Sequence, residues 1–311
     1  MNFSLFSGNV RAAIGAATLA LCFSCIPAGA ATVIFERTSL YHHILVEDDG
    51  DIRTLRFNGS WETKMSKSNP LKGHFEYVEY FQMPFLWNHD IKHVLMGGLG
   101  GGSTVRMYQH YSTNVSVDTV EIDPAVVEVA KKYFNVTEDA LHKIHTNDAR
   151  VFLRRTTNLY DVILLDAYAT TRYGSSLPKQ LTTKEFYEIV NSKLTTNGVL
   201  AYNVIGQMRG FRASVIGAFY KTMKEVFPQV YCFPAEESQN VVFICTKSKE
   251  RFDKARVLKE GDALIKSGVV TLPTFRTRMQ AFWDEVPPSA ASSPLLTDDY
   301  GPLEPLLQGE R

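Results

Sequence analysis

The sequence predicts an α/β fold in which a mainly parallel sheet follows a small β-domain. From Val94 to about residue 250, short apolar runs alternate with segments of helical pattern. Such alternation requires a mainly parallel sheet that is covered on both faces. Before it, residues 32–56 alternate apolar and polar positions around an acidic turn at 47–51, which is typical of a hairpin. With 311 residues, 45% of them hydrophobic, the chain can bury a substantial core.

Residues 1–30 are predicted to be a secretory signal peptide and not part of the fold. Arg11 precedes an uncharged apolar stretch that ends at Ile26, and Ala28 and Ala30 provide the small residues of a cleavage site. We therefore expect cleavage after Ala30 and export to the periplasm or the medium. If the segment stays uncleaved, it would instead anchor the chain to a membrane.

The other elements are predicted from apolar periodicity, helix caps and turn residues. Asn58-Gly59 marks a second turn in the β-domain, and residues 75–86 are predicted to form an amphipathic helix that packs on the core. The expected strands are 93–96, 115–120, a short one from 144, 160–165, 198–203 and a hairpin over 229–245; the expected helices are 104–111, 124–134, 149–155, 182–194 and 213–226. We expect four segments: the signal peptide 1–30, a β-hairpin domain with a helix over 31–85, a nucleoside-binding domain over 86–250, and a helical extension and tail over 251–311.

A glycine-rich turn, residues 97–103, follows the first strand of the parallel sheet. Its sequence, GGLGGGS, permits a close backbone approach that side chains would prevent. Glu121 ends the next strand, 21 residues after Gly100, where a carboxylate can hydrogen-bond both hydroxyls of a ribose. Ser103 replaces the third glycine of a dinucleotide fingerprint, and no lysine follows as a phosphate-binding loop would need. The turn therefore predicts a site for an uncharged or cationic nucleoside.

Three more acids, Asp123, Asp148 and Asp166, fall at or just after predicted strand ends. A carboxylate at the tip of an apolar strand is costly unless it is solvated or bonded, so clustered acids suggest a ligand. Asp148, beside Ala149, suits an adenine amino group, although it would also serve as an ordinary helix N-cap. Asp166 would face the reacting end of the ligand and could accept a proton from an attacking amine.

Composition and motifs exclude several other functions. Lys+Arg and Asp+Glu both number 33, and this zero net charge argues against a nucleic-acid partner. The histidines and cysteines lack the spacing of a zinc site, and no serine lies in a G-x-S-x-G motif. After the signal peptide only Cys232 and Cys245 remain, nearly opposite each other in the hairpin if its turn centres near Ser238. They are either two buried thiols or, in an exported protein, a disulfide.

Several motifs together resemble the spermidine synthase (polyamine aminopropyltransferase) family, in particular its divergent bacterial spermidine synthase-like branch. The similarity extends over nearly all of the chain after residue 30. It is carried by residues 94–102, 120–125, 131–134, 147–150, 160–166 and 181–187, with 39–42 and 57–59 resembling the family's N-terminal β-domain, 76–79 its gatekeeping helix, and 296–300 the divergent branch.

The resemblance implies a class I methyltransferase-like (Rossmann-like) sheet and the transfer of an aminopropyl group from decarboxylated S-adenosylmethionine to putrescine. No metal and no tightly bound cofactor are implied, because the nucleoside is a co-substrate and the partner is a small-molecule amine; a homodimer is possible. The implied site residues are Asp166 as the catalytic proton acceptor; Gly98, Gly100, Gly101, Glu121, Asp123, Asp148 and Ala149 for the nucleoside; and Glu62, Tyr77 and Tyr168 for the amine.

Three positions depart from the family pattern. Gly101 stands where the glycine loop of the family carries an Asp that holds the aminopropyl ammonium. Ala169 replaces the second acid of its D-[ST]-[ST]-D-P motif, and Glu62 replaces a Gln. These departures leave two alternatives. One is an S-adenosylmethionine-dependent methyltransferase, since an intact methionine carboxylate would fit better without the loop acid. The other is a non-catalytic exported protein that binds a polyamine or nucleoside.

Overall fold

The computed structural model describes residues 31–171 and 174–308. The predicted signal peptide lies outside the described residues. Within the described part, no helix is both long and apolar enough to cross a membrane.

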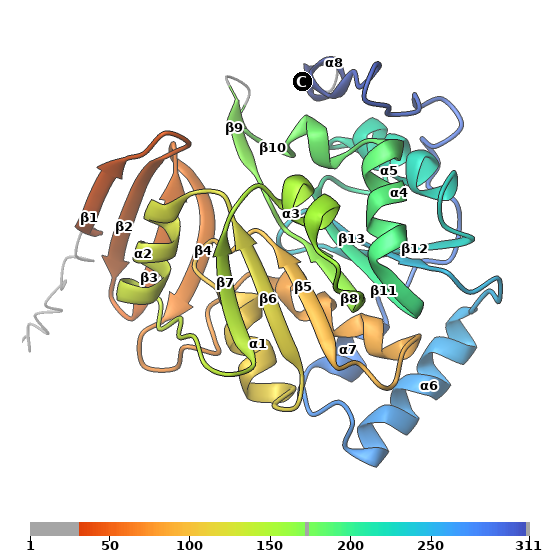
Figure 1. Cartoon of the computed structure of the whole chain (residues 1–311), viewed down its shortest axis with the longest axis horizontal. Helices are drawn as coiled ribbons and strands as arrows, with labels where there is room; N and C mark the ends of the chain where they lie inside the picture. Colours follow the sequence, from red (N-terminus) through yellow and green to blue (C-terminus); the bar gives the residue numbers. More distant parts are fainter. Residues whose placement is uncertain (1–30, 172–173, 309–311) are drawn as a thin grey trace, which may run out of the picture. The chain divides into compact units, whose positions relative to one another are not determined.

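The N-terminal domain is a four-stranded antiparallel sheet in the order β1-β2-β3-β4 (Figure 1). Its strands are β1 (Thr32–Thr38), β2 (His43–Asp49), β3 (Ile52–Phe57) and β4 (Ser60–Ser66). The inner side chains of β2 and β3, among them Val46 and Leu55, pack on Val126 and Val129 of helix α2 (Pro124–Tyr133). The predicted hairpin is therefore confirmed as the β2–β3 pair, and the Asn58-Gly59 turn leads into a further pairing of β3 with β4.

The second sheet has seven strands in the order β12-β13-β11-β8-β5-β6-β7. They are β5 (His93–Gly97), β6 (Ser116–Glu121), β7 (His142–Thr146), β8 (Tyr160–Leu165), β11 (Leu194–Ile205), β12 (Gln229–Ala235) and β13 (Asn240–Thr246). Only β13 runs antiparallel to its neighbours. This arrangement confirms the predicted mainly parallel sheet.

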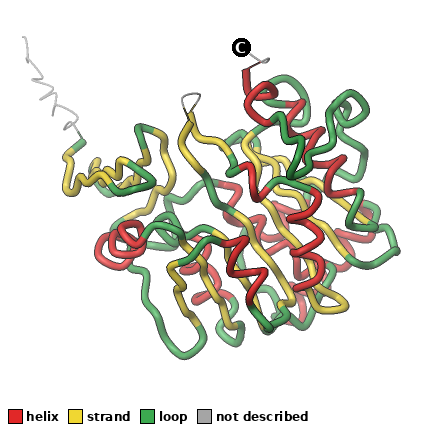
Figure 2. Tube along the Cα trace, turned by 45° about the horizontal axis from the view of Figure 1, so that its top comes forward, coloured by secondary structure: helices red, strands yellow, loops and turns green. Residues whose placement is uncertain are grey.

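Helices cover both faces of this sheet, because alternate side chains of each strand point to opposite sides. On β8, for example, Ile163 and Leu165 enter one core cluster, whereas Val162 and Leu164 enter the other. The first face carries α3 (Ala149–Arg155), α4 (Lys184–Lys193), α5 (Ala213–Lys224) and α8 (Leu303–Gln308); the second carries η1 (Glu76–Leu86), α1 (Ser103–Tyr111), α6 (Lys254–Ser267) and α7 (Phe275–Met279). Figure 2 shows helices on either side of the strands. Short elements, β9 (Ala169–Thr171), β10 (Gly174–Ser176) and η2 (Lys179–Leu181), follow β8.

The segment predicted as an amphipathic helix over 75–86 differs from the expectation. It is a 3-10 helix, and every residue from Tyr77 to Leu86 is buried. The helix lies between the seven-stranded sheet and the helices α6 and α7, so no side of it faces solvent over its length. Its polar residues are held by internal bonds instead: Arg278 of α7 donates to Glu76 (2.9 Å) and to Glu79 (2.5 Å).

The two cysteines are not opposite each other, contrary to the prediction. Cys232 pairs with Phe243, and Cys245 pairs with Val230, because Ala235 pairs with Asn240 and the turn centres between Glu237 and Ser238; opposite cysteines would need a centre one residue later. Moving the turn centre by one residue shifts every cross-strand partner by two. Both cysteines are fully buried free thiols in the core beneath α5.

Candidate functional site

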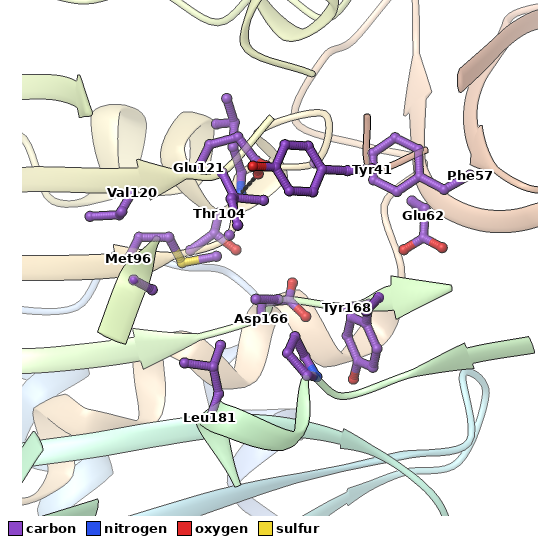
Figure 3. Close-up of a pocket in the computed structure, with 18 of the residues that line it drawn as sticks. Tyr41, Phe57, Glu62, Met96, Thr104, Val120, Glu121, Asp166, Tyr168 and Leu181 are labelled. Carbon is purple, nitrogen blue, oxygen red and sulfur yellow. Dashed lines mark hydrogen bonds between the residues drawn. The ribbon is translucent and has the colours of Figure 1, made fainter. Parts of the chain in front are cut away.

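A cavity of about 270 Å³ opens at the carboxyl ends of β5, β6 and β8. The chain proceeds from β5 outward to β6 and β7, then returns to place β8 on the other side of β5. Ligands of open α/β sheets bind at such a reversal point. The N-terminal sheet contributes Tyr41, Phe57 and Glu62 to the opposite wall (Figure 3).

Most of the predicted site residues meet at this cavity. Nine of the eleven line it, and they come from the N-terminal sheet, η1, the glycine loop and three strand ends: Glu62, Tyr77, Gly98, Gly100, Glu121, Asp148, Ala149, Asp166 and Tyr168. Gly101 and Asp123 do not line it. Within the described residues, no group of three or more His, Cys, Asp or Glu side chains could hold a metal ion.

The glycine loop lies against the end of β8. Gly98 has a φ of +96°, and a Cβ atom on it would stand 2.4 Å from the main-chain oxygen of Asp166. A side chain at this position is therefore excluded by both the backbone conformation and the space. The close approach brings the loop and the Asp166 carboxylate to one cavity.

Glu121 ties the glycine loop to the end of β6. Its two carboxylate oxygens accept the main-chain N–H groups of Leu99 and Asp123, each at 2.9 Å. The side chain is only 7% exposed, and burial raises the pKa of its carboxyl group. Each carboxylate oxygen can accept a further bond, so the group can hold the loop and still receive ribose hydroxyls.

Asp148 and Asp123 are both helix N-caps, but they differ in what else they face. Asp148 accepts the N–H of Val151 (2.9 Å), which confirms the N-cap of α3, and it also lines the cavity, where the adenine contact stays a prediction. Asp123 accepts the N–H of Ala125 (2.9 Å) and the hydroxyl of Ser39, and it is 1% exposed. The predicted nucleoside contact of Asp123 is therefore corrected to a capping role that links α2 to the β1–β2 turn.

Asp166 follows β8 with its carboxylate at the cavity wall. Tyr77 of η1 donates its hydroxyl to Oδ2 (3.2 Å), and the Asn203 amide donates to Oδ1 (2.9 Å). Burial raises the pKa of Asp166 to about 6, against the lowering effect of these two hydrogen bonds. A carboxylate with this pKa is mostly ionised at neutral pH, yet it accepts a proton more readily than an ordinary aspartate.

Asn203 is the main site residue that the sequence did not reveal. It was predicted only as the end of a strand, and it is fully buried in β11 beside β8. The available signal was a polar amide inside the otherwise apolar run Val199–Val204. Because a buried polar group needs a partner, such a residue indicates a specific hydrogen bond.

Gly101, which stands at the position of the family's loop acid, is closely packed in this chain. A Cβ on Gly101 would stand 2.6 Å from Thr63 Cγ2, and the Gly101 N–H already donates to Thr63 Oγ1 (2.9 Å). Gly100 instead lines the cavity, with Thr63 Oγ1 at 3.2 Å as the nearest atom to an added Cβ. An acid on this loop could face the cavity from position 100 but not from position 101.

A second, wider cavity of about 730 Å³ adjoins the first. The two share Glu62, Phe75, Tyr77 and Tyr168 in their walls. These shared side chains stand between the nucleoside-sized pocket and a more open space. A second substrate could therefore reach Asp166 through the wider cavity while the first one occupies the narrower.

Replacing Asp166 by Asn should increase stability relative to the wild type as the pH rises. The folded-state pKa of about 6 lies above the unfolded value, so the wild type loses stability as the pH rises from about 4 through about 6. Asp166→Asn lacks this ionisation and should gain about 1–3 kcal/mol relative to the wild type between pH 4 and pH 8. Urea unfolding of both proteins at the two pH values measures the difference. A gain that is equal at both would show that Asp166 has an ordinary pKa.

The sequence of this chain is similar to known proteins. The spermine/spermidine synthase domain matches residues 75–274. A polyamine aminopropyltransferase of Vibrio vulnificus is 28% identical over 290 residues, covering 88% of this chain and 91% of that protein. An eEF1A lysine and N-terminal methyltransferase of Xenopus laevis is 32% identical over 173 residues, which are 54% of this chain but 24% of that protein. The Vibrio protein thus matches most of this chain, whereas the Xenopus protein matches about half of it.

The solved structure of a probable spermidine synthase from Corynebacterium glutamicum superposes with a TM-score of 0.66. It is 20% identical and covers 88% of this chain and 99% of its own. At this identity the likeness establishes the fold alone. The fold is the predicted methyltransferase-like sheet with an N-terminal antiparallel sheet.

Proposed function

Because this chain belongs to the spermine/spermidine synthase family, we propose that it transfers an aminopropyl group from decarboxylated S-adenosylmethionine to a primary amine, nominally a polyamine such as putrescine. The family uses this nucleoside as a co-substrate. The observation that carries the proposal is the Asp166 carboxylate, which accepts the Tyr77 hydroxyl and lines the same cavity as the glycine loop.

The arrangement supports the placement of the donor nucleoside. Glu121 would accept hydrogen bonds from the ribose hydroxyls. Asp148, beside the start of α3, would accept a hydrogen bond from the adenine amino group. The sulfonium end would then extend toward Asp166, where nearby carboxylates stabilise its positive charge. Gly98 and Asp166 both line the cavity, so the sulfonium end can reach Asp166 beside the glycine loop.

In the proposed reaction, the amine nitrogen attacks the aminopropyl carbon that is bonded to sulfur. The C–N bond forms as the C–S bond breaks, and the sulfur keeps the electron pair and leaves as methylthioadenosine. Asp166 accepts the proton that the nitrogen loses, and Tyr77 holds the carboxylate from the η1 side. Glu62 and Tyr168, in the shared wall of the two cavities, would line the path of the amine.

Methyl transfer is the second candidate, favoured by the loop itself. Gly100 and Gly101 offer no carboxylate for a donor ammonium, so the loop would not repel the carboxylate of intact S-adenosylmethionine. The name of the Xenopus relative, a lysine and N-terminal methyltransferase, is compatible with this alternative.

Product analysis separates these functions. Purified protein is given decarboxylated or intact S-adenosylmethionine together with putrescine and spermidine, and the products are identified by mass spectrometry. The proposal predicts methylthioadenosine and an aminopropylated amine from the decarboxylated donor. Methylated amine and S-adenosylhomocysteine from the intact donor would establish methyl transfer. Nucleoside or polyamine binding without any product would favour an exported binding protein and contradict the proposal.

A loop acid should strengthen binding of the decarboxylated donor when it is placed at position 100. Gly100 has a φ of +51°, which aspartate tolerates better than most residues, and only a hydroxyl lies near the added Cβ. Gly100→Asp should lower the KM for decarboxylated S-adenosylmethionine by about tenfold, as expected for one charged hydrogen bond.

Gly101→Asp is the matched control for this change, measured with the same donor by initial rates and by urea unfolding. Because its Cβ would collide with Thr63, it should cost about 1–3 kcal/mol of stability and leave the KM no lower. A lower KM in Gly101→Asp and not in Gly100→Asp would contradict the loop geometry.

A further inference from the structure

We propose that Asn203 is a positioning residue for Asp166: its amide fixes the orientation of the carboxylate and favours its ionised form, while Tyr168 fixes the amide. The consequence for turnover rests on the proposed function. The effect on Asp166 itself does not, and it can be measured without any substrate.

The sheet register places the two side chains together. β11 runs parallel to β8, and Tyr202 pairs with Leu165, so the next residue on each strand, Asn203 and Asp166, lies at the same level of the sheet. Asn203 Nδ2 donates to Asp166 Oδ1 at 2.9 Å. The Asn203 side chain is fully buried, so water does not compete for this bond.

Tyr168 restricts the amide to one orientation. Asn203 Nδ2 also donates to the Tyr168 hydroxyl oxygen (3.0 Å), and that hydroxyl donates its proton to the main-chain oxygen of Asn203 (3.0 Å). Both amide hydrogens and the hydroxyl proton are therefore used. A flipped amide would set Oδ1 against the Asp166 carboxylate and leave two acceptors facing each other.

The arrangement has a cost that a purely structural residue would avoid. Asn203 Oδ1 is buried and has no hydrogen-bond partner among the described residues. A buried acceptor without a partner destabilises the fold, whereas a leucine of similar size would not carry that penalty. The amide is thus poorly suited to core packing but well suited to donating to a carboxylate.

The tyrosines near Asp166 do not titrate in the same pH range. The charged and titratable side chains that face it or its partners are Tyr77 of η1, Tyr168, Tyr202 of β11, Glu62 of β4 and Arg212 before α5. Burial raises the pKa of all three tyrosines, which therefore stay neutral near pH 6. A change in the titration of Asp166 can then be assigned to the hydrogen bond that is removed.

The test is a titration of Asp166 by NMR on protein labelled with ¹³C at the aspartate carboxyl carbons. The Asp166 resonance is assigned by its loss in Asp166→Asn. Removing the amide donor in Asn203→Leu should raise the pKa of Asp166 by about one unit above the wild-type value, because a hydrogen bond to the ionised form is lost. The acid limb of the kcat/KM profile should move upward in pH by the same amount.

Thr246→Val is the matched control. Thr246 is a buried polar residue of β13, paired with Val199 of β11, and its Oγ1 also has no hydrogen-bond partner among the described residues. This variant should leave the Asp166 titration unchanged. An unchanged Asp166 pKa in a folded Asn203→Leu protein, or an equal shift in Thr246→Val, would overturn the proposal.

If Asn203→Leu fails to fold, Tyr168→Phe provides the second measurement. Loss of the hydroxyl frees the amide to reorient, so the Asp166 pKa should rise by less than one unit, and an unchanged value would overturn the role of Tyr168. A wild-type protein that transfers no group would refute the proposed function. The same titration would still decide the role of Asn203.

Discussion

Replacing Asp166 by Asn should reduce turnover by about 10²–10⁴-fold, the range typical of a lost general base. The variant retains the shape of the side chain but cannot accept the proton that the attacking amine loses. Methylthioadenosine should bind within about twofold of the wild-type affinity, because the proposed contacts of Glu121 and Asp148 with the nucleoside are unchanged. Initial rates and calorimetry on the same preparations measure the two quantities.

Asp161→Asn is the matched control for this variant. Asp161 lies at the opposite end of β8, where its carboxylate accepts the main-chain N–H groups of Lys92 and His93. The substitution removes a carboxylate from the same strand but not from the cavity. The folded Asp161→Asn protein should therefore remain active. Full turnover in Asp166→Asn would mean that another group accepts the proton.

Replacing Glu121 by Ala should weaken methylthioadenosine binding by about 1.5–3 kcal/mol, or about 10- to 150-fold, as expected for hydrogen bonds to a charged group. Part of this loss has a second origin, because Glu121 also holds the Leu99 and Asp123 N–H groups and thereby the glycine loop. Glu121→Gln, which can accept at only one of its two terminal atoms, should give an intermediate affinity by calorimetry.

Asp123→Asn tests whether the nucleoside is bound by Glu121 and not by the neighbouring Asp123. Asparagine is as good an N-cap as aspartate, and Asp123 does not line the cavity, so the affinity should not change. If Asp123→Asn weakened binding as much as Glu121→Ala, the assignment of the ribose to Glu121 would be wrong.

The elements of the α/β sheet could be predicted from sequence because their signals are local. Apolar runs, the glycine turn and the caps at Asp148 and Thr183 each act within one element or its boundary. The strand-end acids could be found for the same reason, since parallel strands bring their carboxyl ends to one edge. Nine of the eleven predicted site residues accordingly line one cavity.

Three of the differences involve contacts between distant segments. The burial of η1 depends on α6 and α7, about 180 residues later along the chain, so its polar positions suggested an exposed face that does not exist. Asn203 and Asp166 are 37 residues apart, and no sequence pattern states that β11 lies beside β8. The collision of position 101 with Thr63 likewise requires the N-terminal sheet to be in place.

A crystal structure with methylthioadenosine bound tests the central claim most directly. The account predicts the ribose hydroxyls within hydrogen-bond distance of Glu121, the adenine amino group at Asp148, and the thioether end directed toward Asp166 between Gly98 and Tyr77. A nucleoside bound in the wider cavity, or bound with its sulfur directed away from Asp166, would contradict the proposed site.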